Sequence, residues 1–300
     1  MKKIFSIIAL LVFPLTAHAQ LKIVTTTTDY ADLAKQIGGD KVDVHSVMRG
    51  PENVHNVMGK PTEMVFLNKA DLFVHSGLDA EPWRDNLLKG ARNPRVMPNK
   101  PGNVDMSNGI ELLEVPGGQA SRAEGDIHAY GNPHYTLSPT SAQRMTVTLA
   151  KAMIAADPAN AGLYKENARK VVGEFAALHR ELKEKLAPLG GLKIVTCHKA
   201  WSYFAQAFDL NIVGVIEPKV GITPSPGDIK RTIDLMKREG VKVVVVETYN
   251  SLADAKIIAD AAGATAIVLP DHVNGIAEAD SYQKLLRYDV EKLIEAAHAR

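Results

Sequence analysis

The chain has 300 residues, of which 46% are hydrophobic and 23% charged, a composition typical of a globular protein with room for two domains rather than of a disordered one. Its formal net charge of +1 provides no overall field that would recruit nucleic acid or an anionic membrane surface. The single cysteine, Cys197, excludes an internal disulfide.

Residues 1–19 have the pattern of a secretory signal peptide. Two lysines precede an apolar run over residues 4–15, and residues 17–19 (Ala-His-Ala) match the site that a signal peptidase cleaves. The run is shorter than the roughly 20 residues that span a bilayer, although an uncleaved signal anchor is the alternative. No cysteine directly follows the cleavage site, which argues against a lipid anchor. The sequence therefore predicts an exported, periplasmic protein that begins near Gln20.

The first half of the mature chain alternates between strand and helix patterns. Strands are predicted at residues 21–27, 41–48 and 71–78, and helices at 29–38, 61–70 and 81–88. Residues 91–125 are rich in Gly, Pro and Asn, which predicts loops with one short strand at 109–113. A helix capped by Ser138 or Thr140 runs to Ala156, and we assign residues 20–156 to an N-terminal lobe.

A single long helix follows. Asp157 and Pro158 form a capping carboxylate with proline at the first helical position. Apolar residues then recur at helical spacing to Leu186, which gives a helix of about 40 Å at 1.5 Å per residue. We assign residues 157–189 to this connecting helix.

The alternation then resumes in a C-terminal lobe, residues 190–300. Strands are predicted at 191–197, 211–216, 241–247 and 264–269, and helices at 200–208, 225–240, 251–263 and 280–299. The run VKVVVVE is typical of a strand buried on both faces of a parallel sheet. The fold class is therefore α/β, with two Rossmann-like lobes that contain parallel sheets and are joined by one long rigid helix.

Polar residues that follow the apolar strands are the candidate ligands, because open α/β sheets bind ligands beyond the carboxyl ends of their strands. Two come from each lobe: His55 and His134 from the first, His198 and Asp271 from the second. Three imidazoles and one carboxylate suit Zn²⁺. The sequence thus predicts a metal site between the lobes.

Each of these residues also has a purely structural interpretation as a cap or a turn residue, and their joint placement favours the site. His128 is an auxiliary ligand or a loop residue, and His272 competes with Asp271. Glu247 also ends a strand, where it can orient a histidine. Cys197 is interpreted as a small buried hydrophobe rather than a ligand.

Several motifs together resemble a known family. They are the leader, HNVMGKPTEMVFLNKADLFVHSGLDAEPW, GNPHYTLSP, VTCHKAWSYFAQAFDL, VVVVET and LPD, in this order. Over essentially the whole mature chain they resemble the periplasmic zinc- or manganese-binding proteins of ABC importers, the cluster A-I (cluster 9) solute-binding proteins. The resemblance implies metal ligands at His55, His134, His198 and Asp271, a permease in the inner membrane as partner, and no enzymatic activity.

Three positions depart from the family pattern. The usual Asp-Pro-His before the first ligand is replaced by residues 52–55, Glu-Asn-Val-His, which implies a differently shaped loop. The usual Leu-Asp-Pro after the second ligand is Leu-Ser-Pro at 137–139, which removes a carboxylate. Residues 117–125 lack the histidines of dedicated zinc scavengers.

The ligand set decides the expected metal. Manganese-preferring members of the family tend to have glutamate where this chain has His198. Three nitrogens and one carboxylate favour zinc, with manganese as the alternative. Because ligating imidazoles must be neutral, we expect metal affinity to fall below about pH 6.5.

The sequence therefore predicts a monomeric periplasmic receptor that captures Zn²⁺ and delivers it to a permease, without a nucleic-acid partner. A secreted zinc hydrolase is the alternative from another class, but a catalytic zinc usually keeps an open position. The sequence has no HExxH motif and no nucleophile elbow. An adhesin-like surface protein on the same scaffold is a third alternative, which the absence of a lipid-anchor cysteine disfavours.

Overall fold

The computed structural model describes residues 19–117, 128–217 and 222–299. The predicted signal peptide lies almost entirely outside the described residues. Within the described part of the chain, none of the helices is both long enough and apolar enough to cross a membrane.

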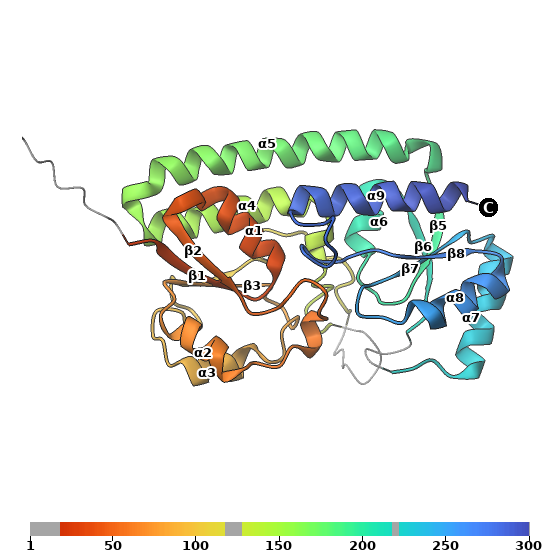
Figure 1. Cartoon of the computed structure of the whole chain (residues 1–300), viewed down its shortest axis with the longest axis horizontal. Helices are drawn as coiled ribbons and strands as arrows, with labels where there is room; N and C mark the ends of the chain where they lie inside the picture. Colours follow the sequence, from red (N-terminus) through yellow and green to blue (C-terminus); the bar gives the residue numbers. More distant parts are fainter. Residues whose placement is uncertain (1–18, 118–127, 218–221, 300) are drawn as a thin grey trace, which may run out of the picture.

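Two four-stranded parallel sheets form the framework (Figure 1). In the first sheet the strand order is β2-β1-β3-β4, and in the second it is β6-β5-β7-β8, so the two sheets share one topology. The strands are β1 (Leu21–Thr25), β2 (Val42–Ser46), β3 (Leu72–His75), β4 (Asn103–Asp105), β5 (Lys193–Thr196), β6 (Asn211–Val215), β7 (Val243–Val246) and β8 (Thr265–Val268). All pairs are parallel, as the buried valine-rich runs predicted.

Helices cover the sheets and connect their strands. They are α1 (Thr28–Gly38), α2 (Pro61–Asn68), α3 (Arg84–Ala91), α4 (Pro139–Ala156), α5 (Ala161–Leu186), α6 (Ser202–Phe208), α7 (Pro226–Glu239), α8 (Leu252–Ala262) and α9 (Tyr282–His298). We call the first sheet with α1–α4 the N-terminal lobe and the second sheet with α6–α9 the C-terminal lobe. The predicted α/β class is confirmed, and the domain boundaries at residues 156/157 and 189/190 stay a prediction.

One strand prediction is wrong. The fourth strand of the first sheet lies at Asn103–Asp105 rather than at residues 109–113. Asn103–Asp105 pairs with Phe73–His75 at the sheet edge, although its short polar sequence has no strand pattern. The apolar run at 109–113 begins instead with Gly109 at φ 83°, a backbone conformation that interrupts a strand.

The predicted long helix is α5, which has 26 residues and 3₁₀ turns at both ends. It contacts α1 and α4 of the N-terminal lobe and α6 and α9 of the C-terminal lobe. In Figure 1, α5 runs along one side of the molecule above both lobes, with α9 beside it. Ion pairs join the two helices, since Arg287 of α9 binds Glu181 of α5 with both guanidinium nitrogens.

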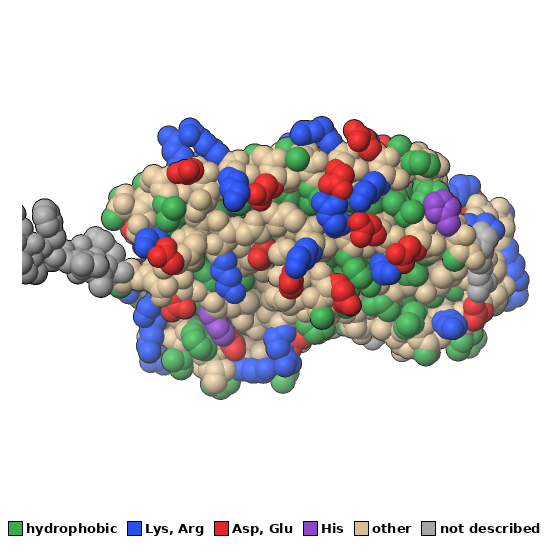
Figure 2. Space-filling view, turned by 45° about the horizontal axis from the view of Figure 1, so that its top comes forward, with side chains coloured by type: hydrophobic (Ala, Val, Ile, Leu, Met, Phe, Trp, Pro, Cys, Tyr) green, Lys and Arg blue, Asp and Glu red, His purple; other side chains and the backbone are tan. Residues whose placement is uncertain are grey.

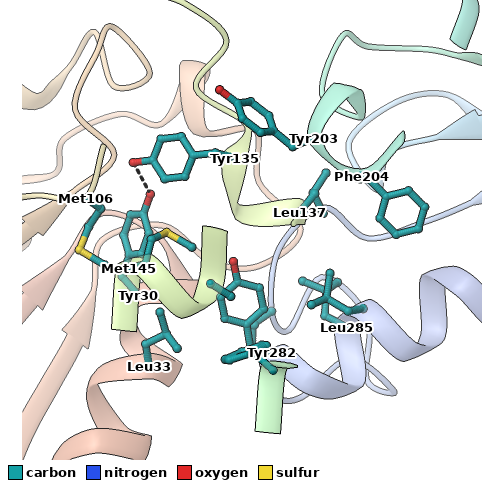
Figure 3. Packing of buried hydrophobic residues seen from close by; sticks show 14 of the residues in the cluster. Tyr30, Leu33, Met106, Tyr135, Leu137, Met145, Tyr203, Phe204, Tyr282 and Leu285 are labelled. Atoms are coloured by element: carbon teal, nitrogen blue, oxygen red, sulfur yellow. Dashed lines mark hydrogen bonds between the residues drawn. The ribbon is translucent and has the colours of Figure 1, made fainter. Parts of the chain in front are cut away.

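The main hydrophobic core is continuous across both lobes. It includes Leu33 of α1, Tyr135 before α4, Phe175 of α5, Phe204 of α6 and Leu285 of α9. Figure 3 shows aromatic and aliphatic side chains from these segments packed together, with a hydrogen bond between the Tyr30 and Tyr135 hydroxyls. Because one core serves both lobes, the packing fixes the position of each lobe against the other.

The face of the molecule that carries α5 has no segregated charge. Figure 2 shows Lys and Arg side chains interspersed with Asp and Glu over the face that carries α5. This mixture is consistent with the net charge of +1.

Candidate metal centre

Three buried histidines meet between the lobes. His55, His134 and His198 are 6%, 5% and 0% exposed, and one ligand atom of each lies within 4.8 Å of the others. Among the described residues, this is the one group of three or more His, Cys, Asp or Glu side chains with such mutual distances. The structure thus brings together three of the four predicted ligands, two from the N-terminal lobe and one from the C-terminal lobe.

His55 lies in a 3₁₀ turn, Val54–Asn56, and its environment fixes its ring. Asn53 caps this turn by accepting a hydrogen bond from the His55 backbone N–H at 2.9 Å. The Trp83 indole N–H donates to the Val54 carbonyl at 2.7 Å, which holds the turn against the start of α3. His55 Nδ1 donates to the Ala80 carbonyl at 2.8 Å. Since a carbonyl can only accept, the neutral ring presents the Nε2 lone pair to the site.

His134 faces His55 directly. The two Nε2 atoms are 3.2 Å apart, and the rings are nearly perpendicular at 87°. The Asn132 side-chain oxygen accepts a hydrogen bond from the His134 backbone N–H at 2.9 Å. The Asn132 side-chain nitrogen donates to the Lys199 carbonyl of the other lobe at 3.1 Å. With the proton of His55 on Nδ1, a neutral His134 donates its Nε2 hydrogen to His55 in the metal-free state. A metal bound to both Nε2 atoms would take the place of that proton.

His198 follows β5 and is held by two glutamates. Glu247 accepts the His198 backbone N–H at 3.1 and 3.2 Å, and also accepts the Trp201 indole N–H at 2.7 Å. Glu217 accepts from the ring Nδ1 at 2.9 Å, which leaves Nε2 for a metal. The prediction that Glu247 orients a histidine thus needs refinement, because Glu247 holds the main chain and Glu217 holds the ring.

Sequence reasoning missed Glu217, although a signal was present. The residue directly follows the apolar run 211–216, so it stands at a strand end like His198 and Asp271. A carboxylate that binds the outer nitrogen of a metal-binding imidazole fixes its tautomer and raises its basicity.

Asp271 is buried, 3% exposed, near the start of the loop after β8, but it does not belong to the group whose ligand atoms all lie within 4.8 Å. Burial raises the pKa of its carboxyl, and the neighbouring His272 partly opposes that rise. Its Oδ1 has no hydrogen-bond partner among the described residues. The assignment of Asp271 as a ligand stays a prediction.

His272 is engaged elsewhere. Its Nδ1 lies 2.5 Å from Asp29 Oδ2, and its Nε2 lies 3.7 Å from Asp271 Oδ2. Burial lowers the pKa of His272, but the carboxylates of Asp29 and Asp271 outweigh it and raise the pKa to about 9. An imidazole that holds a proton at neutral pH is a poor metal ligand. This favours Asp271 over His272.

His128 borders the triad. Its ring centroid is 5.0 Å from that of His55 and 5.9 Å from that of His134, and its Nδ1 lies 2.7 Å from Asp79 Oδ1. It does not meet the mutual distances of the triad. Its auxiliary role stays a prediction.

Cys197 is buried in the apolar cluster beneath β5 and β7, as predicted. Burial, assisted by Glu247 and Glu217, raises the pKa of its thiol. A thiol that stays protonated does not bind zinc, which binds the thiolate.

The geometry and electrostatics fit a divalent cation. Two nitrogens on one tetrahedral zinc, each at about 2.05 Å, lie about 3.3 Å apart, close to the 3.2 Å between His55 and His134. Burial, followed by repulsion from His55 and His198, holds the pKa of His134 well below 6.5. The ring is therefore neutral at physiological pH, the state that coordination requires.

Two parallel α/β lobes, a long helix beside both, and buried imidazoles between them define a metal-binding solute receptor. The family model of the periplasmic component A of the zinc-uptake complex, ZnuA, matches residues 23–296, and the chain belongs to this family. It is therefore the extracytoplasmic metal-binding component of an ABC importer, which implies a permease partner, and it is a solute-binding protein rather than an enzyme.

Similar proteins differ in the metal that their names give. A ZnuA deletion mutant with zinc bound has a TM-score of 0.78 and 28% identity, with 94% of this chain and 99% of that chain covered. The manganese ABC transporter substrate-binding lipoprotein PsaA of Streptococcus pneumoniae is 26% identical, with 98% of this chain and 99% of that protein covered. The iron-binding protein YfeA of Yersinia pestis is 27% identical, with 84% and 77% covered.

Proposed function

We propose that the protein is a periplasmic, high-affinity Zn²⁺ receptor that delivers zinc to an ABC permease of the inner membrane. Its ligands are His55, His134, His198 and Asp271. The observation that carries the proposal is the convergence of three buried imidazoles, with the Nε2 atoms of His55 and His134 at 3.2 Å. In this proposal the protein acts as a monomer. It also acts without a lipid anchor, because its one cysteine, Cys197, does not directly follow the leader.

The donor set supports zinc over manganese. Imidazole nitrogen is a borderline-soft ligand that suits zinc, while manganese prefers carboxylate, carbonyl and water oxygens. The zinc-bound ZnuA structure supports this choice, whereas PsaA keeps manganese as the alternative.

Asp271 supplies the fourth position in this proposal. Burial raises the pKa of its carboxyl, and a bound dication would stabilise the ionised form strongly. Four protein ligands close a tetrahedral shell, as expected for a receptor and not for a hydrolytic zinc. His128, paired with Asp79, provides an auxiliary ligand at the edge of the site.

The test is metal analysis and competition titration on protein stripped with a chelator. We expect one zinc per chain, a preference for zinc over manganese, and a large loss of zinc affinity in His134→Ala and His198→Ala. His179→Ala is the matched control, because His179 lies on α5, does not belong to the triad, and donates from Nε2 to the Ala207 carbonyl at 3.0 Å. Equal zinc binding by all four proteins would refute the ligand assignment.

A further inference from the structure

Asp29 links the N-terminal lobe to the loop that carries Asp271. It lies in the first turn of α1 and is 0% exposed. One carboxylate oxygen faces His272 Nδ1 at 2.5 Å, and the other accepts the Val273 backbone N–H at 3.0 Å. Both oxygens of a single carboxylate thus bind the two residues that directly follow Asp271, more than 240 positions away in the sequence.

The rest of this loop also packs on the N-terminal lobe. Gly50 lies so close to Asn274 that a Cβ at position 50 would come within 2.2 Å of the Asn274 carbonyl carbon. Asn274 itself has φ 61°, and its N–H donates to the Ala279 carbonyl at 2.7 Å, which closes a tight turn. The loop therefore follows a strand of the C-terminal sheet in the sequence but packs against the N-terminal lobe.

We infer that Asp29 is a positioning residue for metal binding: its carboxylate holds residues 272 and 273 so that Asp271 is directed at the metal from the N-terminal side. The inference rests on the proposed function, in which Asp271 is the fourth ligand. Asp29 does not itself touch the metal. It acts by restricting the conformations of the loop before the metal binds. Metal binding then does not have to meet the entropic cost of ordering the loop.

The test compares Asp29→Asn with Asp32→Asn by competition titration with Zn²⁺ alone. Asp32 is a matched control, since it lies on the same helix and also bridges the lobes, but to the Tyr282 backbone N–H at 3.0 Å rather than to the metal loop. We expect Asp29→Asn to weaken zinc binding about 10- to 100-fold, as is typical for residues that orient ligands, and Asp32→Asn to change it less than about twofold. His272→Gln repeats the test from the other side of the contact, should Asp29→Asn fail to fold.

A double-mutant cycle separates positioning from general stability. In an Asp271→Asn background, Asp29→Asn should cause no further loss of zinc affinity, whereas in a His134→Ala background it should cause its full loss. An Asp29→Asn effect of the same size in both backgrounds would overturn the inference and leave the receptor function intact. Wild-type zinc affinity in Asp271→Asn would instead refute Asp271 as a ligand, and with it the inference.

Discussion

Glu217 provides a sharp test of how the protein prepares His198 for a metal. Its carboxylate accepts the Nδ1 hydrogen of His198 at 2.9 Å, and its side chain is only 16% exposed, so water screens this contact weakly. A metal bound at Nε2 withdraws electron density from the ring and makes Nδ1–H a stronger hydrogen-bond donor. The hydrogen bond from Nδ1 to the Glu217 carboxylate therefore strengthens. The contact therefore stabilises the bound state more than the free one.

The structure allows the magnitude to be bracketed. In Glu217→Gln, the amide oxygen can still accept from Nδ1, so a charge-assisted bond of about 1.5–3 kcal/mol becomes a neutral one of about 0.5–1.5 kcal/mol. The difference, about 1–1.5 kcal/mol, corresponds to a five- to tenfold weaker zinc affinity. Glu217→Ala removes the bond entirely, and we expect a loss of about 10- to 100-fold.

The assay is competition against a chelator of known zinc affinity at pH 7.5, with thermal unfolding of each metal-free protein measured in parallel. Glu239→Gln serves as the control, because Glu239 pairs with Lys193 at the surface of the same lobe at 3.0 Å. The expected order of affinity is wild type and Glu239→Gln, then Glu217→Gln, then Glu217→Ala. The reasoning would be refuted if both Glu217 variants lowered the melting temperature but bound zinc like the wild type.

Three further predictions concern stability and protonation. Burial raises the pKa of the Asp289 carboxyl, neither oxygen of which has a hydrogen-bond partner among the described residues. Because the unfolded chain loses this proton first, the free energy of unfolding should fall as pH rises above 3.8. The decrease is about 1.4 kcal/mol per pH unit up to the pKa of the folded state. Asp289→Asn should remove this slope in urea unfolding between pH 4.5 and 8, and parallel slopes would contradict it. Burial lowers the pKa of His134 in the folded state, so the unfolded chain binds this proton first as pH falls. The free energy of unfolding, measured without metal, should therefore decrease below pH 6.5. A His134→Asn variant whose free energy of unfolding has the same pH dependence would argue against this. Cys197→Ala should bind zinc within about twofold of wild type, and the native thiol should resist a thiol reagent until urea unfolds the protein.

Most of the fold could be predicted from the sequence because its signals are local. The valine-rich run before Glu247 predicts a buried strand, and the apolar spacing up to Leu186 predicts an amphipathic helix. Neither prediction requires knowledge of the tertiary contacts. β4 was misplaced for the converse reason. Asn103–Asp105 becomes a strand only because it can pair with Phe73–His75 at the sheet edge. Its own three residues, one valine between two polar residues, contain no pattern that predicts this pairing.

The site divides in the same way. The rule that ligands lie beyond strand ends selected His198 and Asp271 as candidate ligands and Glu247 as an orienting group, and it applies equally to Glu217, which directly follows the apolar run 211–216. The contact of Asp29 with the Asp271 loop has no such signal. It joins residues 243 and 244 positions apart, and it exists only once both lobes share a core.

The arrangement of the three imidazoles indicates where affinity for a cation originates. The Ala80 carbonyl and the Glu217 carboxylate accept from the Nδ1 atoms of His55 and His198, so in each ring Nε2 is the nitrogen whose lone pair can bind a metal. The Nε2 atoms of His55 and His134 are only 3.2 Å apart, and burial of all three rings weakens the screening of electrostatic interactions among them. Side-chain and backbone contacts from both lobes keep the rings there nonetheless. The cost of bringing these lone pairs together is met during folding, so a dication that enters gains its coordination energy without first having to assemble the three imidazoles.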